Sequence, residues 1–229
     1  MPKLSLTDGA EAFDVTVLEA VGARRVVLFA VGGGGNPERH LPLLTALAEH
    51  GCRVVAPHFE RLPSLQVREH DLLLRGRRLR LALDSVAGPA EWVAGVGHSI
   101  GTTMLLALAG AQIWMRPGSR LAIAPDPRLE RLVLLAPATG FFQAPGALDA
   151  VRTPILAWAG SNDSITPPAQ AEFLQHARGA RVAVEVRLAE GAGHFSFMHA
   201  PPPQTTEPLA NREAFLASLT SEVCRFVTR

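Results

Sequence analysis

Continuous apolar runs of strand length are the feature that most limits how this 229-residue chain can fold. Residues 26–29, 133–135 and 155–158 consist only of apolar or aromatic residues. Strands that are apolar on both faces are typical of the centre of a parallel sheet, because helices cover such a sheet on each side. Residues 13–18 instead alternate between apolar and polar, so we expect them to form an edge strand with one wetter face.

Segments with helical patterning separate the apolar runs. We predict strands at residues 13–19, 25–30, 53–57, 93–97, 131–136, 154–159 and 182–188. We predict helices at residues 41–50, 66–86, 100–113, 167–176 (with Thr166 as N-cap) and 212–228. This alternation predicts an α/β fold in which residues 1–229 form one domain with a doubly wound, mostly parallel sheet of about seven strands. Ligands bind such sheets at the carboxyl ends of the strands, so the chemistry is expected there.

The composition excludes several classes of partner. A formal net charge of +1 offers no electrostatic basis for binding nucleic acid or an anionic membrane. No apolar run approaches the length that crosses a bilayer, and the first seven residues lack the pattern of a signal peptide. We therefore expect no membrane insertion and a cytoplasmic location. The two cysteines, Cys52 and Cys224, are expected to be buried, reduced thiols.

The pentapeptide Gly97-His98-Ser99-Ile100-Gly101 lies between a predicted strand and a predicted helix. In that context Gly-x-Ser-x-Gly is typical of a nucleophile elbow, a tight turn that presents a serine hydroxyl. We therefore predict that Ser99 is a nucleophile; the alternative is that it merely caps its helix. His98 is expected to be a packing and hydrogen-bonding neighbour. A serine hydroxyl is unreactive at neutral pH without a base, so the prediction requires a second histidine.

A candidate base and a candidate acid each follow a predicted strand. His194 lies in a glycine-rich loop after the last strand and is the predicted base, with His199 as its rival. Asp163 is the predicted acid, which would fix the tautomer of the histidine. Asp126 and Asp149 are weaker candidates because neither directly follows a strand. The two histidines lack a carboxylate or cysteine that would complete a metal site, so no metal is expected.

Four consecutive glycines at residues 32–35 follow the predicted strand at residues 25–30. The backbone N–H groups of Gly33 and Ile100 are predicted to donate to the oxygen of a reacting carbonyl and so form an oxyanion hole. The alternatives are a phosphate-binding turn and a flexible connection. The sequence lacks the Lys-Ser/Thr of a Walker motif after these glycines, and no acidic residue ends the next strand, as a dinucleotide fingerprint requires.

These elements, in the order Ser99, Asp163 and His194, resemble those of the α/β-hydrolase superfamily over nearly the whole chain. The chain is most similar to the compact dienelactone-hydrolase-like group. It also resembles platelet-activating-factor acetylhydrolases in its Gly-His-Ser-x-Gly turn and in the stretch His194-Phe195-Ser196-Phe197. The resemblance implies hydrolysis of an ester or a related acyl bond of a small molecule, without a cofactor.

Three departures from these relatives have consequences. Dienelactone hydrolases have a cysteine nucleophile where this chain has Ser99, which puts their substrate in doubt. Val31-Gly32 stands where many α/β-hydrolases have His-Gly, which changes how the glycine loop is anchored. Residues 139–152 are too few for the cap domain of larger lipases, so we expect no large cap and a fairly open site.

The sequence thus predicts a serine hydrolase that cleaves a small acyl ester or lactone-like substrate through an acyl-enzyme, as a monomer or small homo-oligomer. A thioesterase or peptidase with the same residues stays open, as does an inert binding protein of this fold. Three phenylalanines that follow strand ends are candidates for an acyl pocket or for the core: Phe141, Phe195 and Phe197. Four arginines are expected on a solvated helix face, or as a site for an anionic ligand: Arg75, Arg77, Arg78 and Arg80.

Overall fold

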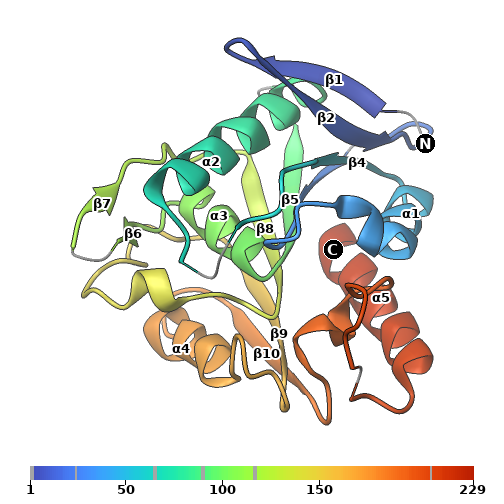
Figure 1. Cartoon of the computed structure of the whole chain (residues 1–229), viewed down its shortest axis with the longest axis vertical. Helices are drawn as coiled ribbons and strands as arrows, with labels where there is room; N and C mark the ends of the chain where they lie inside the picture. Colours follow the sequence, from blue (N-terminus) through green and yellow to red (C-terminus); the bar gives the residue numbers. More distant parts are fainter. Residues whose placement is uncertain (1–2, 24, 64–65, 89–90, 116–117, 207) are drawn as a thin grey trace.

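The computed structural model describes residues 3–23, 25–63, 66–88, 91–115, 118–206 and 208–229. These residues contain an eight-stranded sheet in the order β1-β2-β4-β3-β5-β8-β9-β10 (Figure 1). From β4 to β10 neighbouring strands run parallel, whereas β1 and β2 are antiparallel to their neighbours. The strands are β1 (Lys3–Asp8), β2 (Glu11–Leu18), β3 (Arg25–Ala30), β4 (Cys52–Pro57), β5 (Trp92–His98), β8 (Leu129–Leu135), β9 (Ile155–Gly160) and β10 (Val184–Ala189). The mostly parallel α/β sheet that the sequence predicts is confirmed.

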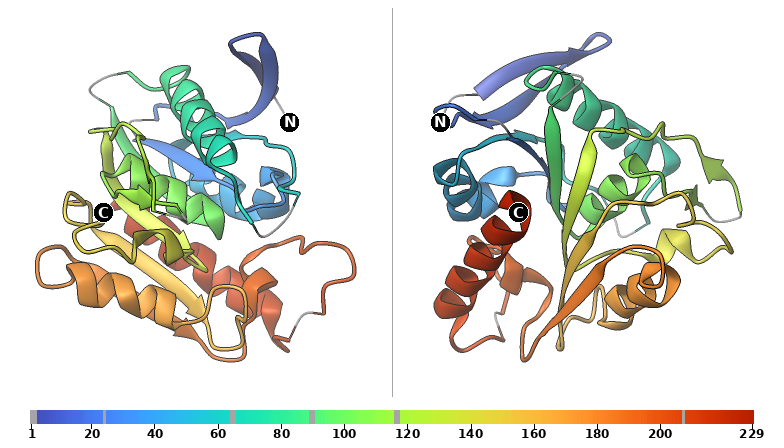
Figure 2. Two further views of the ribbon diagram at one scale, coloured as in Figure 1. Left: turned by 60° about the vertical axis from the view of Figure 1, so that its left-hand side comes forward. Right: turned by 180° about the vertical axis from the view of Figure 1, so that it is seen from behind.

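Helices cover both faces of this sheet (Figures 1 and 2). They are α1 (Leu41–Glu49), α2 (Glu69–Asp84), α3 (Ile100–Leu108), α4 (Ala169–Arg178) and α5 (Arg212–Thr228). Side chains of α2, α3 and α4 share one core with Val26 and Leu28 of β3, and side chains of α1 and α5 share the other with Val27 and Phe29. Both faces of the central strands are therefore buried, which is why their sequences are continuously apolar.

The N-terminal strand β1 was not predicted from the sequence. It pairs with β2 from Lys3 opposite Thr16 to Asp8 opposite Glu11, so β1 and not β2 forms this edge of the sheet. The expectation that residues 13–18 are an edge strand is therefore wrong. Residues 15–17 of β2, which lies between β1 and β4, are all buried, whereas β1 is largely exposed.

Helix α3 is shorter than predicted. It ends at Leu108, and Gly110 follows with φ 107° while its N–H donates to the Ala107 carbonyl. This left-handed conformation, which glycine adopts without steric cost, ends the helix. The chain then forms a small hairpin of β6 (Ile113–Trp114) and β7 (Arg120–Leu121).

The arginines of α2 do not share one solvated face, contrary to the expectation from the sequence. Arg75 and Arg78 are buried, whereas Arg77 and Arg80 are more exposed. The β1–β2 hairpin is the reason for Arg78, because it brings the Asp8 carboxylate within 3.4 Å of the Arg78 guanidinium and 2.9 Å of that of Arg77. Arg75 instead lies beneath the glycine loop.

Cys52 and Cys224 are both buried and unbonded, as expected. Burial raises the pKa of both thiols, that of Cys224 to about 11. No helix in the described part of the chain is long and apolar enough to cross a membrane.

Candidate functional site

Ser99 occupies a sharp turn between β5 and α3. Its φ of 55° and ψ of −129° lie in a region that side-chain-bearing residues rarely adopt. The turn depends on two close approaches: a Cβ at Gly101 would overlap the Ala30 carbonyl oxygen, and one at Gly97 would lie 2.8 Å from a Leu105 methyl group. The flanking glycines of the pentapeptide therefore let strand β3, the turn and α3 pack together, and the half-buried serine side chain stands at the carboxyl end of the sheet.

His194 lies within hydrogen-bond distance of this serine. It begins the short 3₁₀ helix η3 (His194–Phe197), and its Nε2 is 2.9 Å from the Ser99 Oγ. The histidine is 7% exposed, so little water reaches the ring. The loops that follow β9 and β10 meet here. They approach so closely that a Cβ at Gly160 would overlap the Ala192 carbonyl oxygen. The rival His199 has no contact with Ser99 among the hydrogen bonds of the described residues.

Asp163 supports the other side of the histidine ring. Its Oδ2 accepts from His194 Nδ1 at 2.8 Å and from the Thr166 hydroxyl at 2.7 Å. Its Oδ1 accepts from the backbone N–H groups of Ile165 and Thr166, each at 2.8 Å. Burial by itself raises the pKa of this carboxyl. The hydrogen bond and charge of His194, together with the two hydrogen bonds from Thr166, outweigh burial and hold the pKa below its usual value. The carboxylate is thus ionised and fully hydrogen-bonded.

Thr166 belongs to this hydrogen-bonded group. The prediction that it caps a helix is wrong. Helix α4 begins only at Ala169, with Pro168 as its N-cap residue. The Thr166 hydroxyl also lies 3.1 Å from His194 Nδ1 and 3.2 Å from the Ala136 carbonyl oxygen. The signal for this role is the Asp-x-x-Thr spacing, in which an aspartate oxygen binds the amide three residues later.

Two further histidines continue inward from His194. The His98 ring stands 4.9 Å from that of His194, and its Nε2–H donates to the His194 carbonyl at 2.9 Å. The His40 ring lies 5.3 Å beyond that of His98 and 4.9 Å from the Phe29 ring. Burial, reinforced by the neighbouring histidine, lowers the pKa of His98 to about 3, and burial lowers that of His40 well below the usual value. Both rings are therefore neutral at neutral pH, and His98 is the hydrogen-bonding neighbour that the sequence suggests.

The glycine loop runs beside Ser99. A Cβ at Gly32 would lie 3.3 Å from the Ser99 Cβ, so this backbone passes directly against the serine. The loop is tied back on its far side: the Leu62 N–H donates to the Gly33 carbonyl and the Phe59 N–H to the Gly35 carbonyl. Gly35 has φ 78° and no space for a Cβ against Phe59. The N–H of Ile100, the first residue of α3, lies at the helix N-terminus, where the backbone N–H groups have no partner within the helix.

A narrow cavity of about 60 Å³ opens at these residues. Ser99, His194, Gly33 and Phe195 are among the residues that line it. The other two phenylalanines suggested for an acyl pocket lie elsewhere. Phe141 packs against the core on the α3 side, and Phe197 is fully buried with its ring 5.6 Å from that of Phe215. Of the three, only Phe195 lines the cavity.

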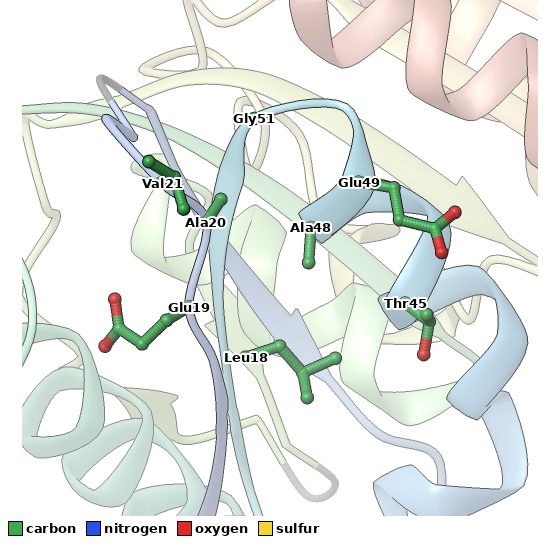
Figure 3. Close-up of a pocket in the computed structure, with 8 residues that line it drawn as sticks. All are labelled: Leu18, Glu19, Ala20, Val21, Thr45, Ala48, Glu49 and Gly51. Atoms are coloured by element: carbon green, nitrogen blue, oxygen red, sulfur yellow. The ribbon is translucent and has the colours of Figure 1, made fainter.

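A larger, open hollow of about 590 Å³ lies elsewhere (Figure 3). It lies between the turn after β2 and the C-terminal end of α1, and its lining includes Leu18, Val21, Thr45 and Glu49. None of the three hydrogen-bonded site residues reaches it. The polar side chains that line this hollow are those of Glu19, Thr45 and Glu49, and its lining contains no histidine or serine. Among the described residues, no group of three His, Cys, Asp or Glu side chains could hold a metal ion.

Comparison with known proteins gives structural matches only. The sequence matches no protein-family model and no curated protein. A dienelactone hydrolase from Anabaena variabilis is 19% identical with a TM-score of 0.70, over 99% of this chain and 96% of that chain. An α/β serine hydrolase homologue from Coxiella burnetii is 16% identical with a TM-score of 0.64, over 98% and 96%. A predicted CIB-like hydrolase from Thermoplasma acidophilum is 15% identical with a TM-score of 0.67, over 98% of both chains. At these identities the likeness establishes the architecture: the described chain has the α/β-hydrolase fold, in a compact form without a cap domain.

Proposed function

We propose that the protein is a serine hydrolase that cleaves a small carboxylic ester through an acyl-enzyme. The observation that carries the proposal is the unbroken chain of hydrogen bonds from the Ser99 hydroxyl through His194 to Asp163. In such a chain the histidine can take the serine proton while the carboxylate stabilises the imidazolium that forms. The solved structures with this fold include proteins described as hydrolases and esterases, which supports the same reaction class.

The first step forms the acyl-enzyme. The Ser99 oxygen attacks the carbonyl carbon of the ester as its proton moves to His194 Nε2. The carbonyl oxygen then carries a negative charge, for which the N–H groups of Gly33 and Ile100 are the proposed donors. Each donor of this kind stabilises a transition state by roughly 3 kcal/mol. His194 returns the proton to the alkoxide leaving group, and the carbon–oxygen bond to that group breaks.

The second step releases the acid. A water molecule gives its proton to His194 Nε2 and attacks the acyl carbon, and the Ser99 oxygen leaves with the proton that the histidine returns. Throughout, Asp163 remains a carboxylate and holds the Nδ1 proton of the histidine. The cavity of about 60 Å³ favours a short acyl group such as acetyl or propionyl.

The test is covalent labelling of the serine, followed by kinetics. A fluorophosphonate probe should label the wild-type protein once, and Ser99→Ala should abolish labelling. Hydrolysis of an aryl acetate should fall about 10⁶-fold in Ser99→Ala, because the nucleophile and base act as one unit. Ser119→Ala, at an exposed serine, is the matched control and should retain both activities.

The outcome also separates the alternatives. A well-folded wild-type protein that no fluorophosphonate labels would contradict the proposal and favour an inert binding protein. The protein could instead be labelled but have a greater kcat/KM on acyl thioesters or amides than on esters of the same acyl group. That result would support Ser99 as the nucleophile and contradict the ester as its substrate.

A further inference from the structure

Arg75 is a buried cation on α2 that lies beneath the glycine loop. Its side chain is 2% exposed. Its Nη1 lies 3.3 Å from the carbonyl oxygens of both Val31 and Gly32, and its Nη2 lies 3.5 Å from the Glu60 carbonyl oxygen. The guanidinium also stands over the Phe59 ring, 4.6 Å from its centre. Its neighbours Arg77 and Arg78 pair with carboxylates, whereas no carboxylate in the described part of the chain forms an ion pair with Arg75.

Burial of this group is costly, and yet it stays charged. Burial lowers the pKa of Arg75 to about 10, which the Asp71 charge only partly offsets, so the guanidinium carries its proton at neutral pH. Its partners are carbonyl oxygens and the Phe59 ring, and a buried charge is costly unless it is paired and hydrogen-bonded. Its stabilising contacts are concentrated on the backbone at the start of the glycine loop, which is where a substrate carbonyl is proposed to bind.

The contact with Gly32 restricts the next amide group. In a trans peptide, the carbonyl of one residue and the N–H of the next point in opposite directions. The Gly32 carbonyl accepts from Arg75 and also from the Gly35 N–H at 3.1 Å. The Gly33 N–H must therefore point away from α2. Gly33 lines the cavity beside Ser99, and we infer that its N–H points into that cavity.

We propose that Arg75 is a positioning residue for the oxyanion hole, which holds the Gly32–Gly33 peptide so that its N–H is directed at the substrate oxygen. Two carbonyls held by one planar guanidinium leave this peptide little freedom to rotate. A donor on the carbonyl oxygen also polarises the peptide and makes its N–H a stronger donor. This role rests on the proposed serine chemistry at Ser99 and concerns only how the negative oxygen is stabilised.

In the described part of the chain, Arg75 is the one side chain that anchors this place, beside the bond from the Gly35 N–H to the Gly32 carbonyl. Glycines at residues 32–35 give the loop little intrinsic rigidity, because their backbones are not restricted by a Cβ. The backbone bonds from Leu62 and Phe59 hold the carbonyls of Gly33 and Gly35, which lie further along the loop. Among the described residues, Arg75 alone contacts the carbonyls of Val31 and Gly32 together.

The test compares Arg75→Met with Arg77→Met on the same helix. Arg75→Met should lower kcat for an aryl acetate by roughly 30- to 100-fold, less than complete loss of an oxyanion donor, with KM within threefold. Affinity for a trifluoromethyl ketone, which forms a tetrahedral oxyanion on the serine, should fall by the same factor as kcat/KM. Arg77→Met should leave both values within twofold of wild type.

Arg75→Lys guards against a variant that fails to fold. A lysine keeps the charge but has one nitrogen where the guanidinium uses two, so it cannot hold the carbonyls of Val31, Gly32 and Glu60 together. Both kcat and ketone affinity should therefore fall by roughly 5- to 20-fold. If the folded Arg75→Lys or Arg75→Met protein retains both at wild-type levels, the inference is wrong. If the wild-type protein is not labelled by a fluorophosphonate, the proposed function itself has failed, which is a different result.

Discussion

Two groups of buried polar side chains meet at Ser99, and they differ in how well their polar atoms are paired. In the acid–base group (Asp163, Thr166 and His194), both ring nitrogens and both carboxylate oxygens have partners within 3.1 Å. In the histidine stack (His98 and His40), three of the four ring nitrogens have no partner among the described residues. Full pairing fixes the orientation of the first group, which the proposed proton transfer requires, whereas the second group packs as neutral rings.

The difference has an electrostatic consequence. The hydrogen bonds of the acid–base group favour the charged form of Asp163, so the pKa of that carboxyl is low. The surroundings of the histidine stack favour the neutral form of each ring, so the pKa values of His98 and His40 are low as well. A low pKa in an acid preserves charge at neutral pH, and a low pKa in a base removes it. Substitutions should therefore affect activity in the first group and acid stability in the second.

Within these two groups of side chains, the largest effect is expected for Asp163→Asn. An amide cannot both accept the Nδ1 proton of His194 and stabilise its positive charge, and it favours the wrong tautomer. We expect kcat for an aryl acetate to fall about 10⁴-fold, with KM nearly unchanged. The control is Asp149→Asn, at a more exposed aspartate that pairs with Arg178. Equal losses in the two variants would contradict the assignment of Asp163.

Lowering the pH should reveal the energetic cost of keeping the histidine stack neutral. An unfolded histidine has a pKa near 6.5, and that of folded His98 is about 3, so the unfolded chain binds more protons between these values. Stability therefore falls as the pH drops below 6.5. Between pH 7 and pH 5 the neutral His98 should cost about 2 kcal/mol, and His40, whose pKa is also lowered, should add to the loss. Urea unfolding at the two pH values measures this loss, and unchanged midpoints would show that the stack is not held neutral.

His40→Phe should remove the part of that loss that comes from His40. The phenyl ring keeps the contact with Phe29 but cannot take up a proton in the unfolded state, so the difference in stability between pH 7 and pH 5 should shrink. Any overpacking by the larger ring affects both pH values equally and cancels in this difference. The exposed His50→Phe variant is the control, and its pH dependence should match that of wild type.

The sequence predicts the acid–base group far better than the histidine stack. Ser99, Asp163 and His194 each follow a predicted strand, and a parallel sheet brings the carboxyl ends of its strands to one edge. Their proximity therefore follows from topology. His40 lies at the end of the 3₁₀ helix η1 (Pro37–His40), and its position against His98 depends on side-chain packing that no local pattern records.

The errors in the predicted fold also arise from contacts that no local sequence pattern records. The Lys3–Asp8 segment is mostly exposed and forms a strand because β2 is there to pair with it. The burial of Arg78 follows from that pairing, and the burial of Arg75 follows from the path of the glycine loop. Each depends on a contact between distant segments, so helix periodicity alone places these arginines in solvent.

The smallest effect on kcat is expected for Thr166→Val, which tests the hydrogen bonding within the acid–base group most directly. Valine fills the same space but removes the hydroxyl that donates to Asp163 Oδ2, while the backbone N–H of residue 166 still binds Oδ1. One of four hydrogen bonds to the carboxylate is lost, and a bond to a charged group of this kind contributes about 1.5 kcal/mol. We therefore expect kcat to fall about tenfold, and Thr166→Ser, which keeps the hydroxyl, to stay within threefold of wild type. If valine and serine behave alike, the hydroxyl does not orient the carboxylate, and the backbone amides of Ile165 and Thr166 are sufficient to hold Asp163 against His194.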